Sequence, residues 1–133
     1  MSQDMIAANL AAVEAHFGNE ASGRVQAAVD LYTDDIIWEA PSRNLVLKGK
    51  QAVAANYREM FSGFKDMEFH TKDRFATEDR VVDDSTVTFE LTKSGFMNLP
   101  KGTKCEMRLT HIFEMRDGKI CKEIGIEGPP KTR

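Results

Sequence analysis

The sequence predicts an α+β fold, with helices in the first half of the chain and a curved, mostly antiparallel sheet in the second. Two periodicities support this prediction. In the first half, apolar residues recur at the spacing of one helix face, beginning with Ile6, Leu10, Val13 and Phe17. In the second half, apolar and polar residues alternate, as in "TVTFEL" and "HIFEM", which is typical of strands with one buried face.

Three helices are expected from the apolar spacing and its boundaries. The first spans about 4–17 and is closed by Gly18. The second starts near Ser22, a good N-cap residue, and runs to about Thr33. The third spans about 50–62, after Gly49.

The strands follow from alternation and from the turn residues between them. "IIWEAP" is a short strand stopped by Pro41, and "SRNLVLKG" is a turn with a short extended piece. Four longer strands are expected over 67–76, 81–97, 103–115 and 119–127.

The composition is that of an ordinary globular protein. The chain has 133 residues, 41% of them hydrophobic and 29% charged, with a net charge of −3 and no basic stripe, so we expect no nucleic-acid partner. The N-terminus has neither a basic region nor an apolar run of about 18 residues, so we expect no signal peptide, no membrane span and a cytoplasmic location. Residues 1–128 are predicted to form a single domain and 129–133 a flexible tail.

The last hairpin, "HIFEMRDGKICKEIG", allows two registers. A two-residue Asp-Gly turn pairs Arg116 with Lys119 and carries Lys122 among the apolar residues of the facing strand. A three-residue loop with a left-handed glycine pairs Met115 with Lys119 and keeps Lys122 off that face. We favour the three-residue loop, because x-D-G is its usual sequence.

The favoured register has consequences for the polar residues and for the cysteines. His111 lies directly opposite Glu123, with their Cβ atoms about 5 Å apart. Phe113 faces Cys121, which leaves Cys105 roughly 26 Å away along the strand. A disulfide needs Cα atoms within about 7 Å, so both cysteines are expected to be free thiols.

The same register gathers three isoleucines on the outer face of the sheet. They are Ile112, Ile124 and Ile126. Such a patch is large for an exposed surface, so we expect a second copy of the chain to cover it in a two-fold homodimer.

The order of elements, with "LYTDDIIWEAP" and "HIFEMRDGKI" as landmarks, resembles the NTF2-like superfamily, in particular its SnoaL-like and ketosteroid-isomerase-like branch. The resemblance covers about residues 5–127. It implies the cystatin-like cone, in which three N-terminal helices pack in a curved sheet around one hydrophobic pocket. The superfamily includes isomerases, polyketide cyclases, epoxide hydrolases, dehydratases and non-catalytic binding proteins, so membership alone selects no activity.

Carrying the family's functional positions over gives a mixed result. The oxyanion-binding tyrosine of ketosteroid isomerases falls on His16, and their protonated acid falls on His111. Their supporting aromatic positions fall on Tyr32 and Tyr57. Their general base falls on Ala40, so the resemblance implies no ketosteroid isomerase of the usual mechanism.

Two other catalytic sets of the superfamily are also incomplete. The aspartate of SnoaL-type cyclases falls on Gly125. The Arg, Asp and Asp of limonene-epoxide-hydrolase-like members fall on Thr92, Ser94 and Gly125.

His111 with Glu123 is the strongest candidate for catalysis, because a carboxylate can orient and charge an imidazole for proton transfer. The alternative is a partly buried ion pair that only stabilises the fold. His16, together with Tyr32 and Tyr57, could donate hydrogen bonds to a carbonyl or an oxyanion. The alternative is that these three are aromatic core residues.

Asp73 is a further candidate because it shares the strand parity of three apolar residues and would therefore point inward. Burial raises the pKa of a carboxyl group and would make Asp73 an acid or a base. A bulge near "TEDR" would instead turn it to solvent. Trp38 and Phe113 are expected to line the pocket.

No metal and no other cofactor is expected. The residues that could offer ligands, His16, His111, Glu123 and Cys121, match no known ligand spacing.

Three functions remain open at this stage. One is a cofactor-free acid/base enzyme (an isomerase, cyclase, dehydratase or hydrolase) acting on a small apolar carbonyl-bearing or cyclic substrate. The others are a protein that binds an apolar small molecule without turnover and a dimerisation domain with a vestigial pocket. A perturbed pKa in the pocket favours the first, complete pairing of the polar groups favours the second, and a filled interior favours the third.

Overall fold

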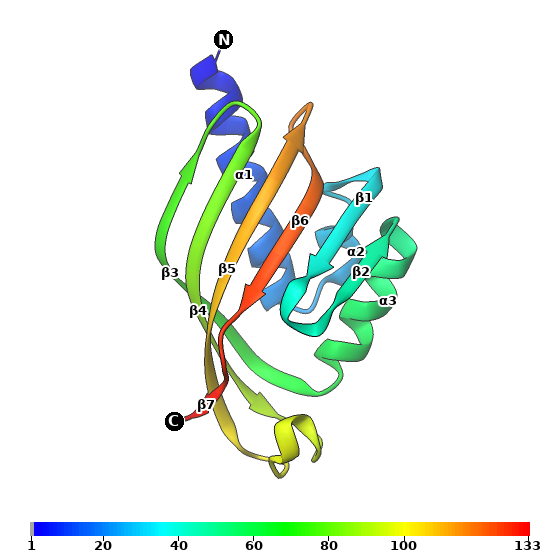
Figure 1. The fold of residues 1–133 in the computed structure, drawn as a ribbon, viewed down its shortest axis with the longest axis vertical. Coiled ribbons are helices and arrows are strands. Elements are labelled where there is room, and N and C mark those ends of the chain that lie inside the picture. Colours follow the sequence, from blue (N-terminus) through cyan, green and yellow to red (C-terminus); the bar gives the residue numbers. More distant parts are fainter. Residues whose placement is uncertain (1) are drawn as a thin grey trace.

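A computed structural model describes residues 2–133 and confirms an α+β fold with a curved sheet (Figure 1). The three helices are α1 (Ser2–Ala21), α2 (Val25–Val29) and α3 (Lys50–Phe61). The strands are β1 (Tyr32–Ala40), β2 (Leu45–Lys48), β3 (Phe64–Ala76), β4 (Arg80–Leu91), β5 (Lys104–Arg116), β6 (Lys119–Glu127) and β7 (Lys131–Thr132). Short 3-10 turns, Pro41–Arg43 and Phe96–Asn98, follow β1 and β4.

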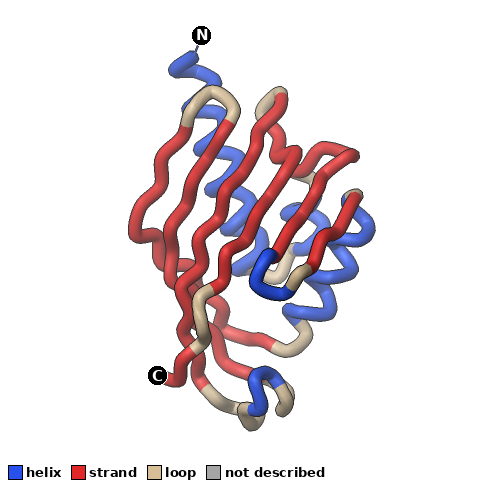
Figure 2. The backbone as a smooth tube through the Cα atoms, in the orientation of Figure 1, coloured by secondary structure: helices blue, strands red, loops and turns tan. Residues whose placement is uncertain are grey.

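The strands form one sheet in the order β2-β1-β6-β5-β4-β3, with β7 alongside β5. All pairs are antiparallel except β1 with β6, which are parallel. The helices lie on one face of this sheet, and the opposite face carries none of them (Figure 2). The helices are not consecutive along the chain, because β1 and β2 lie between α2 and α3, in the order that the sequence pattern predicts.

The first helix is longer than predicted because Gly18 does not end it. Ala21 is the last residue of the helix. Gly23 follows it with a φ of 73°, the left-handed conformation that commonly terminates a helix. Ser22 is therefore no N-cap, and its hydroxyl instead donates to the carbonyl of Gly18 over 2.9 Å. The extra turn places Glu20 one turn after His16 on the same face of α1.

The predicted three-residue loop of the last hairpin is wrong. Arg116 pairs with Lys119, so the turn has two residues. Asp117 and Gly118 have φ of 53° and 77°, as a type I′ turn requires at both central positions.

A β-bulge then changes the register along β6. Met115 pairs with Ile120 but Glu114 pairs with Lys122, so Cys121 is the extra residue. The Cys121 thiol donates to the carbonyl of Glu114 over 3.3 Å. The predicted pairing of His111 with Glu123 is therefore wrong as well.

Beyond the bulge the register brings Glu123 opposite Phe113 and Gly125 opposite His111. Both β6 residues face the interior and are buried. Glu123 is thus the diagonal neighbour of His111 on the inner face.

A second bulge overturns the prediction for Asp73. Thr71 pairs with Ser85 but Asp73 pairs with Asp84, so the strand changes faces at Lys72. Asp73 is exposed on the outer face, and the side chain of Arg74 enters the interior instead.

The C-terminal segment, for which we expected a flexible tail, forms strand β7. Lys131 and Thr132 pair with Glu106 and Cys105, at the end of β5 that β6 does not reach. An unpaired strand edge offers free backbone groups, and the C-terminal segment bonds to them here.

The outer face carries an apolar row in register across four strands. Phe75 pairs with Val82, Val82 with Ile112, and Ile112 with Ile124. Ile126 lies nearby on β6 and is 47% exposed. We call Phe75, Val82, Ile112 and Ile124 the outer apolar row.

Cys105 and Cys121 are free thiols, as predicted. None of the helices within residues 2–133 is both long and apolar enough to cross a lipid bilayer.

Candidate functional site

A cavity of about 630 Å³ opens between α3 and the concave face of the sheet. Much of its wall is aromatic or thioether surface, which suits an apolar ligand. This part of the wall includes Met60, Phe61, Phe64, Phe69, Phe89 and Met107.

The less buried polar residues of the cavity lining are Ser42, Arg43, Glu59, Lys93, Ser94 and Glu127. Deeper polar side chains come from five elements: Glu20 of α1, Trp38 of β1, Asn56 and Tyr57 of α3, His111 of β5 and Glu123 of β6. All except the half-buried Asn56 are buried. A few convergent polar groups in an otherwise apolar cavity are typical of a ligand site.

Glu123 accepts the hydrogen bonds of a buried chain of donors. The hydroxyl of Tyr32 donates to Glu123 Oε1 over 2.7 Å. The hydroxyl oxygens of Tyr57 and Tyr32 are 2.7 Å apart, and the indole N–H of Trp38 donates to the hydroxyl of Tyr57 over 3.1 Å. In this series of hydrogen bonds, the N–H of Trp38 and both tyrosine hydroxyls can therefore direct their protons towards the carboxylate of Glu123.

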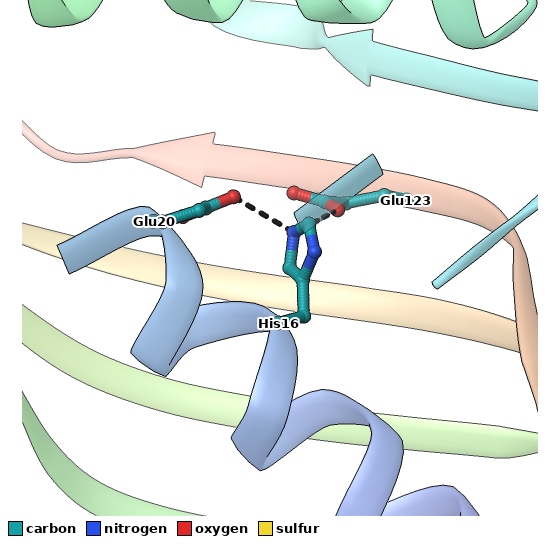
Figure 3. Close-up of side chains that lie close together, drawn as sticks. All are labelled: His16, Glu20 and Glu123. Atoms are coloured by element: carbon teal, nitrogen blue, oxygen red, sulfur yellow. Dashed lines mark ion pairs between the residues drawn. The ribbon is translucent and has the colours of Figure 1, made fainter. Parts of the chain in front are cut away.

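His16 lies behind the cavity wall, and its Nε2 faces the carboxylates of Glu20 and Glu123 (Figure 3). Nδ1 is 3.0 Å from the carbonyl of Ala28, which can only accept, so this nitrogen carries a proton. Nε2 is hydrogen-bonded to the Tyr32 hydroxyl at 3.1 Å and lies 2.7 Å from Glu20 Oε1 and 3.2 Å from Glu123 Oε1. This surrounding favours the doubly protonated, charged imidazolium.

The pKa values reflect this arrangement. Burial lowers the pKa of His16, but the carboxylates of Glu20 and Glu123 outweigh burial and raise it well above its usual 6.5. Burial raises the pKa of Glu123, but the His16 charge and the surrounding donors outweigh it and hold the value well below 4.5. Burial and the charge of Glu123 raise the pKa values of Tyr32 and Tyr57, so both hydroxyls keep their protons.

The same three side chains place potential metal-ligand atoms within 4.8 Å of one another: His16, Glu20 and Glu123. An imidazole nitrogen has one bonding direction, and at His16 Nε2 the Tyr32 hydroxyl takes it. A zinc ion needs a position about 2.0–2.1 Å from that nitrogen and would have to displace the hydroxyl. The arrangement therefore fits a shared proton rather than a metal ion.

His111 is held at the cavity wall by its neighbours. Its ring stacks on Phe113 with ring centroids 5.4 Å apart, and Phe17 meets it edge-on at 5.0 Å. Nε2 lies 3.6 Å from Glu123 Oε2, whereas the buried Nδ1 has no hydrogen-bond partner within residues 2–133. A Cβ at Gly125 would lie 3.7 Å from the imidazole, an ordinary van der Waals contact, so the ring packs directly over this residue.

Comparison with known proteins places the chain in a family. A model of the SnoaL-like domain matches residues 13–123. The chain belongs to the SnoaL-like family. The predicted resemblance to the NTF2-like superfamily is thereby confirmed. No curated protein sequence matches this SnoaL-like chain significantly.

Solved structures share the fold of this SnoaL-like protein at low sequence identity. A proposed polyketide cyclase from Xanthomonas campestris pv. campestris has a TM-score of 0.81 and 16% identity, covering 92% of this chain and 91% of the other. An LEH-like epoxide hydrolase from M. tuberculosis has a TM-score of 0.75 and 16% identity, covering 92% and 84%. A proposed ketosteroid isomerase from Kribbella flavida has a TM-score of 0.72 and 13% identity, covering 93% and 80%.

The structure separates the predicted site residues of this SnoaL-like protein into three groups. His111, Glu123, Trp38 and Tyr57 line the cavity. His16, Tyr32 and Phe113 are fully buried behind its wall and support lining residues. None of the three is placed to touch a ligand, although contact with the ligand was predicted for each of them. Asp73 lies outside on the opposite face of the sheet.

Among the deeper polar residues of the cavity lining, Glu20 and Asn56 are missing from the sequence prediction. The spacing of four residues between His16 and Glu20 would indicate a pair on one helix face, but only for a helix that continues beyond Gly18. Asn56 has no distinguishing sequence signal. Ala40 and Gly125, the positions onto which the resemblance carries the family's acids, line the cavity without an acid. The buried acids among the lining residues are Glu20 and Glu123.

Proposed function

We propose that this SnoaL-like protein is a cofactor-free acid/base enzyme in which His111 moves a proton of a small, apolar, carbonyl-bearing substrate. The observation that carries the proposal is the state of the imidazole. Its Nε2 faces the ionised Glu123, which favours a proton there, and its Nδ1 has no protein partner among residues 2–133. A neutral ring with that tautomer has a free lone pair to act as a general base.

The proposed step is reversible and balanced. His111 Nδ1 takes a proton from the carbon beside the carbonyl, so the C–H bond breaks, an N–H bond forms and the electron pair moves into an enolate. The imidazolium then returns the proton to the same carbon or, in a conjugated substrate, to a new one. Glu123 stabilises the imidazolium that forms in between.

The other polar residues have supporting roles in this proposal. The charge of His16 and the hydroxyl of Tyr32 keep Glu123 ionised beside the catalytic ring. Tyr57 and Trp38 position each other at the wall, and Phe113 supports the plane of the imidazole by stacking.

Proton exchange at carbon tests the proposal without knowledge of the natural substrate. A panel of apolar ketones in D₂O is followed by ¹H NMR for loss of the protons beside the carbonyl. We expect wild type to exchange at least one ketone about 100-fold faster than His111→Gln, since general-base catalysis contributes 10²–10⁴-fold. His70→Gln is the matched control, because His70 is an exposed histidine on β3. Equal rates for wild type and His111→Gln across the panel would overturn the proposal.

A non-catalytic binding protein is the second candidate. The chain from Trp38 through Tyr57 and Tyr32 to Glu123 is satisfied internally, as expected if these groups only build a wall. Saturable binding of the panel ketones, with exchange no faster than in buffer, would favour this alternative.

We also propose that a second copy of the chain covers the outer apolar row and Ile126. The row crosses four strands on the face that carries no helix, and Phe75 is 56% exposed there. A two-fold pairing of two such rows would bury both.

A further inference from the structure

Three buried polar atoms have no hydrogen-bond partner among residues 2–133, and they share one location. They are Glu20 Oε1, Asn56 Nδ2 and His111 Nδ1. All three residues line the same cavity, although they come from α1, α3 and β5. Buried polar groups in folded proteins are almost always paired. Glu20 Oε1 has an ionic partner in His16, so the ligand is the natural missing partner of Asn56 Nδ2 and His111 Nδ1.

Glu20 offers a hydrogen-bond acceptor. The residue is 6% exposed, and its Oε1 faces His16 Nε2 at 2.7 Å in an ion pair (Figure 3). Because Glu20 also lines the cavity, its second carboxylate oxygen is left for a donor from the cavity side. The His16 imidazolium offsets part of the charge of this carboxylate, and a neutral hydroxyl group can donate to it.

Asn56 offers the complementary donor. Its Nδ2 belongs to an amide on α3, directly before Tyr57, and an amide nitrogen can only donate. A carbonyl oxygen of the ligand is the natural acceptor. If the carbonyl becomes an enolate, as in the proposed function, the same N–H stabilises the developing negative charge.

We propose that the ligand of this cavity is an apolar hydroxy-carbonyl compound, with Glu20 accepting from its hydroxyl group and Asn56 donating to its carbonyl oxygen. The placement of the carbonyl near His111 rests on the proposed function, whereas the pairing with Glu20 and Asn56 does not require turnover. A site built to bind a hydroxyl rejects an analogue that lacks it, because its own buried group is then left unpaired.

Binding of matched probes tests this inference. The probes are isomers of hydroxylated acetylnaphthalene, their methyl ethers, the corresponding naphthols without the acetyl group, and aminomethyl analogues of the acetylnaphthalenes. Dissociation constants are measured by isothermal titration calorimetry. We expect at least one hydroxyketone to bind about tenfold or more tightly than both its methyl ether and its naphthol, as for a hydrogen bond to a charged group.

Variants assign the preference to residues. Glu20→Met removes the acceptor and should abolish the preference for the hydroxyl group over the methyl ether. Glu20→Gln, which keeps the shape of the side chain, should reduce this preference and replaces Glu20→Met if that variant does not fold. Asn56→Leu should abolish the preference for the acetyl group. The matched controls are Glu78→Gln, in the exposed turn before β4, and Gln51→Leu, an exposed amide on α3.

The outcomes are separable from those of the proposed function. Equal affinity for hydroxyketones and their methyl ethers, or a preference that survives in both Glu20 variants, would overturn the inference. Tightest binding of the aminomethyl analogues would overturn it in favour of an ammonium ligand. His111→Gln should keep both preferences, so an inactive protein with intact preferences would refute the proton transfer alone.

Discussion

The Tyr32 hydroxyl donates to Glu123 Oε1 over 2.7 Å, and the same oxygen of Tyr32 lies 2.7 Å from the Tyr57 hydroxyl and 3.1 Å from His16 Nε2. The fully buried hydroxyl group of Tyr32 thus connects Tyr57, His16 and Glu123. The cavity wall depends on it, although Tyr32 is not part of that wall.

Tyr32→Phe should therefore destabilise the protein more than Tyr57→Phe. Removing the shared hydroxyl leaves several buried polar groups short of a partner, and we expect a loss of about 2 kcal/mol or more in the free energy of unfolding. Urea titration followed by circular dichroism measures it. A Tyr32→Phe variant within about 0.5 kcal/mol of wild type would contradict the central position of this hydroxyl.

The stability should depend on pH through His16 and Glu123. The pKa of His16 is raised on folding, so its contribution is complete below its usual pKa of 6.5 and is lost as pH rises towards the folded-state value. The pKa of Glu123 is lowered, so its contribution is complete above 4.5 and is lost as pH falls towards its folded-state value. Stability should therefore be highest between these two pH values.

His16→Gln should remove the alkaline part of this profile. Above pH 6.5, wild type should lose up to about 1.4 kcal/mol per pH unit, the slope for one proton, whereas His16→Gln should stay flat up to the range where thiols and tyrosines titrate. Thermal denaturation across pH, with His70→Gln as the control, measures both slopes. A decline that persists in His16→Gln would assign it to another group.

The two members of the candidate catalytic pair should differ in their effect on stability. Glu123→Gln leaves the buried charge of His16 with Glu20 alone and should cost about 3 kcal/mol. His111→Gln breaks a 3.6 Å contact and the ring contacts with Phe113 and Phe17, and it should cost less, about 1.5 kcal/mol. Equal losses in the two variants would make the imidazole a structural element and weaken its role as a base.

The dimer proposal predicts an effect of charge in the outer apolar row. Ile112→Lys should convert dimers to monomers without loss of fold, because the substituted side chain would be buried unpaired in the interface. Analytical ultracentrifugation measures the mass, and Met5→Lys, at a residue of α1 that is 47% exposed, is the control. A wild-type protein that is monomeric at high concentration would refute the proposal directly.

The fold was predictable because apolar periodicity marks which face of each element is buried. The third helix, expected over 50–62, is observed as Lys50–Phe61, and the strand expected over 119–127 is observed as Lys119–Glu127. The second helix was overestimated, since Tyr32 and the residues after it belong to β1. Propensity alone does not distinguish a short helix from the edge of a strand.

The candidate site was only partly predictable because bulges and caps depend on tertiary structure. Asp73 was assigned to the interior by alternation, and an extra residue at Lys72 reversed its face. Glu20 was missed because Gly18 was interpreted as the end of the helix, although the left-handed Gly23 ends it. The closeness of His111 and Glu123 was found despite the wrong register, since directly opposite and diagonal positions share one face.

The bulge at Cys121 also bears on how such a protein can change over generations. If the register at the turn continued with the same residues and no bulge, Lys122 and Ile124 would face the interior in place of Glu123 and Gly125. Loss of the Cys121 codon would have the opposite outcome, because removing the extra residue gives a regular ladder that keeps Glu123 opposite Phe113. The segment can therefore lose one residue at this point without changing the face that carries the carboxylate.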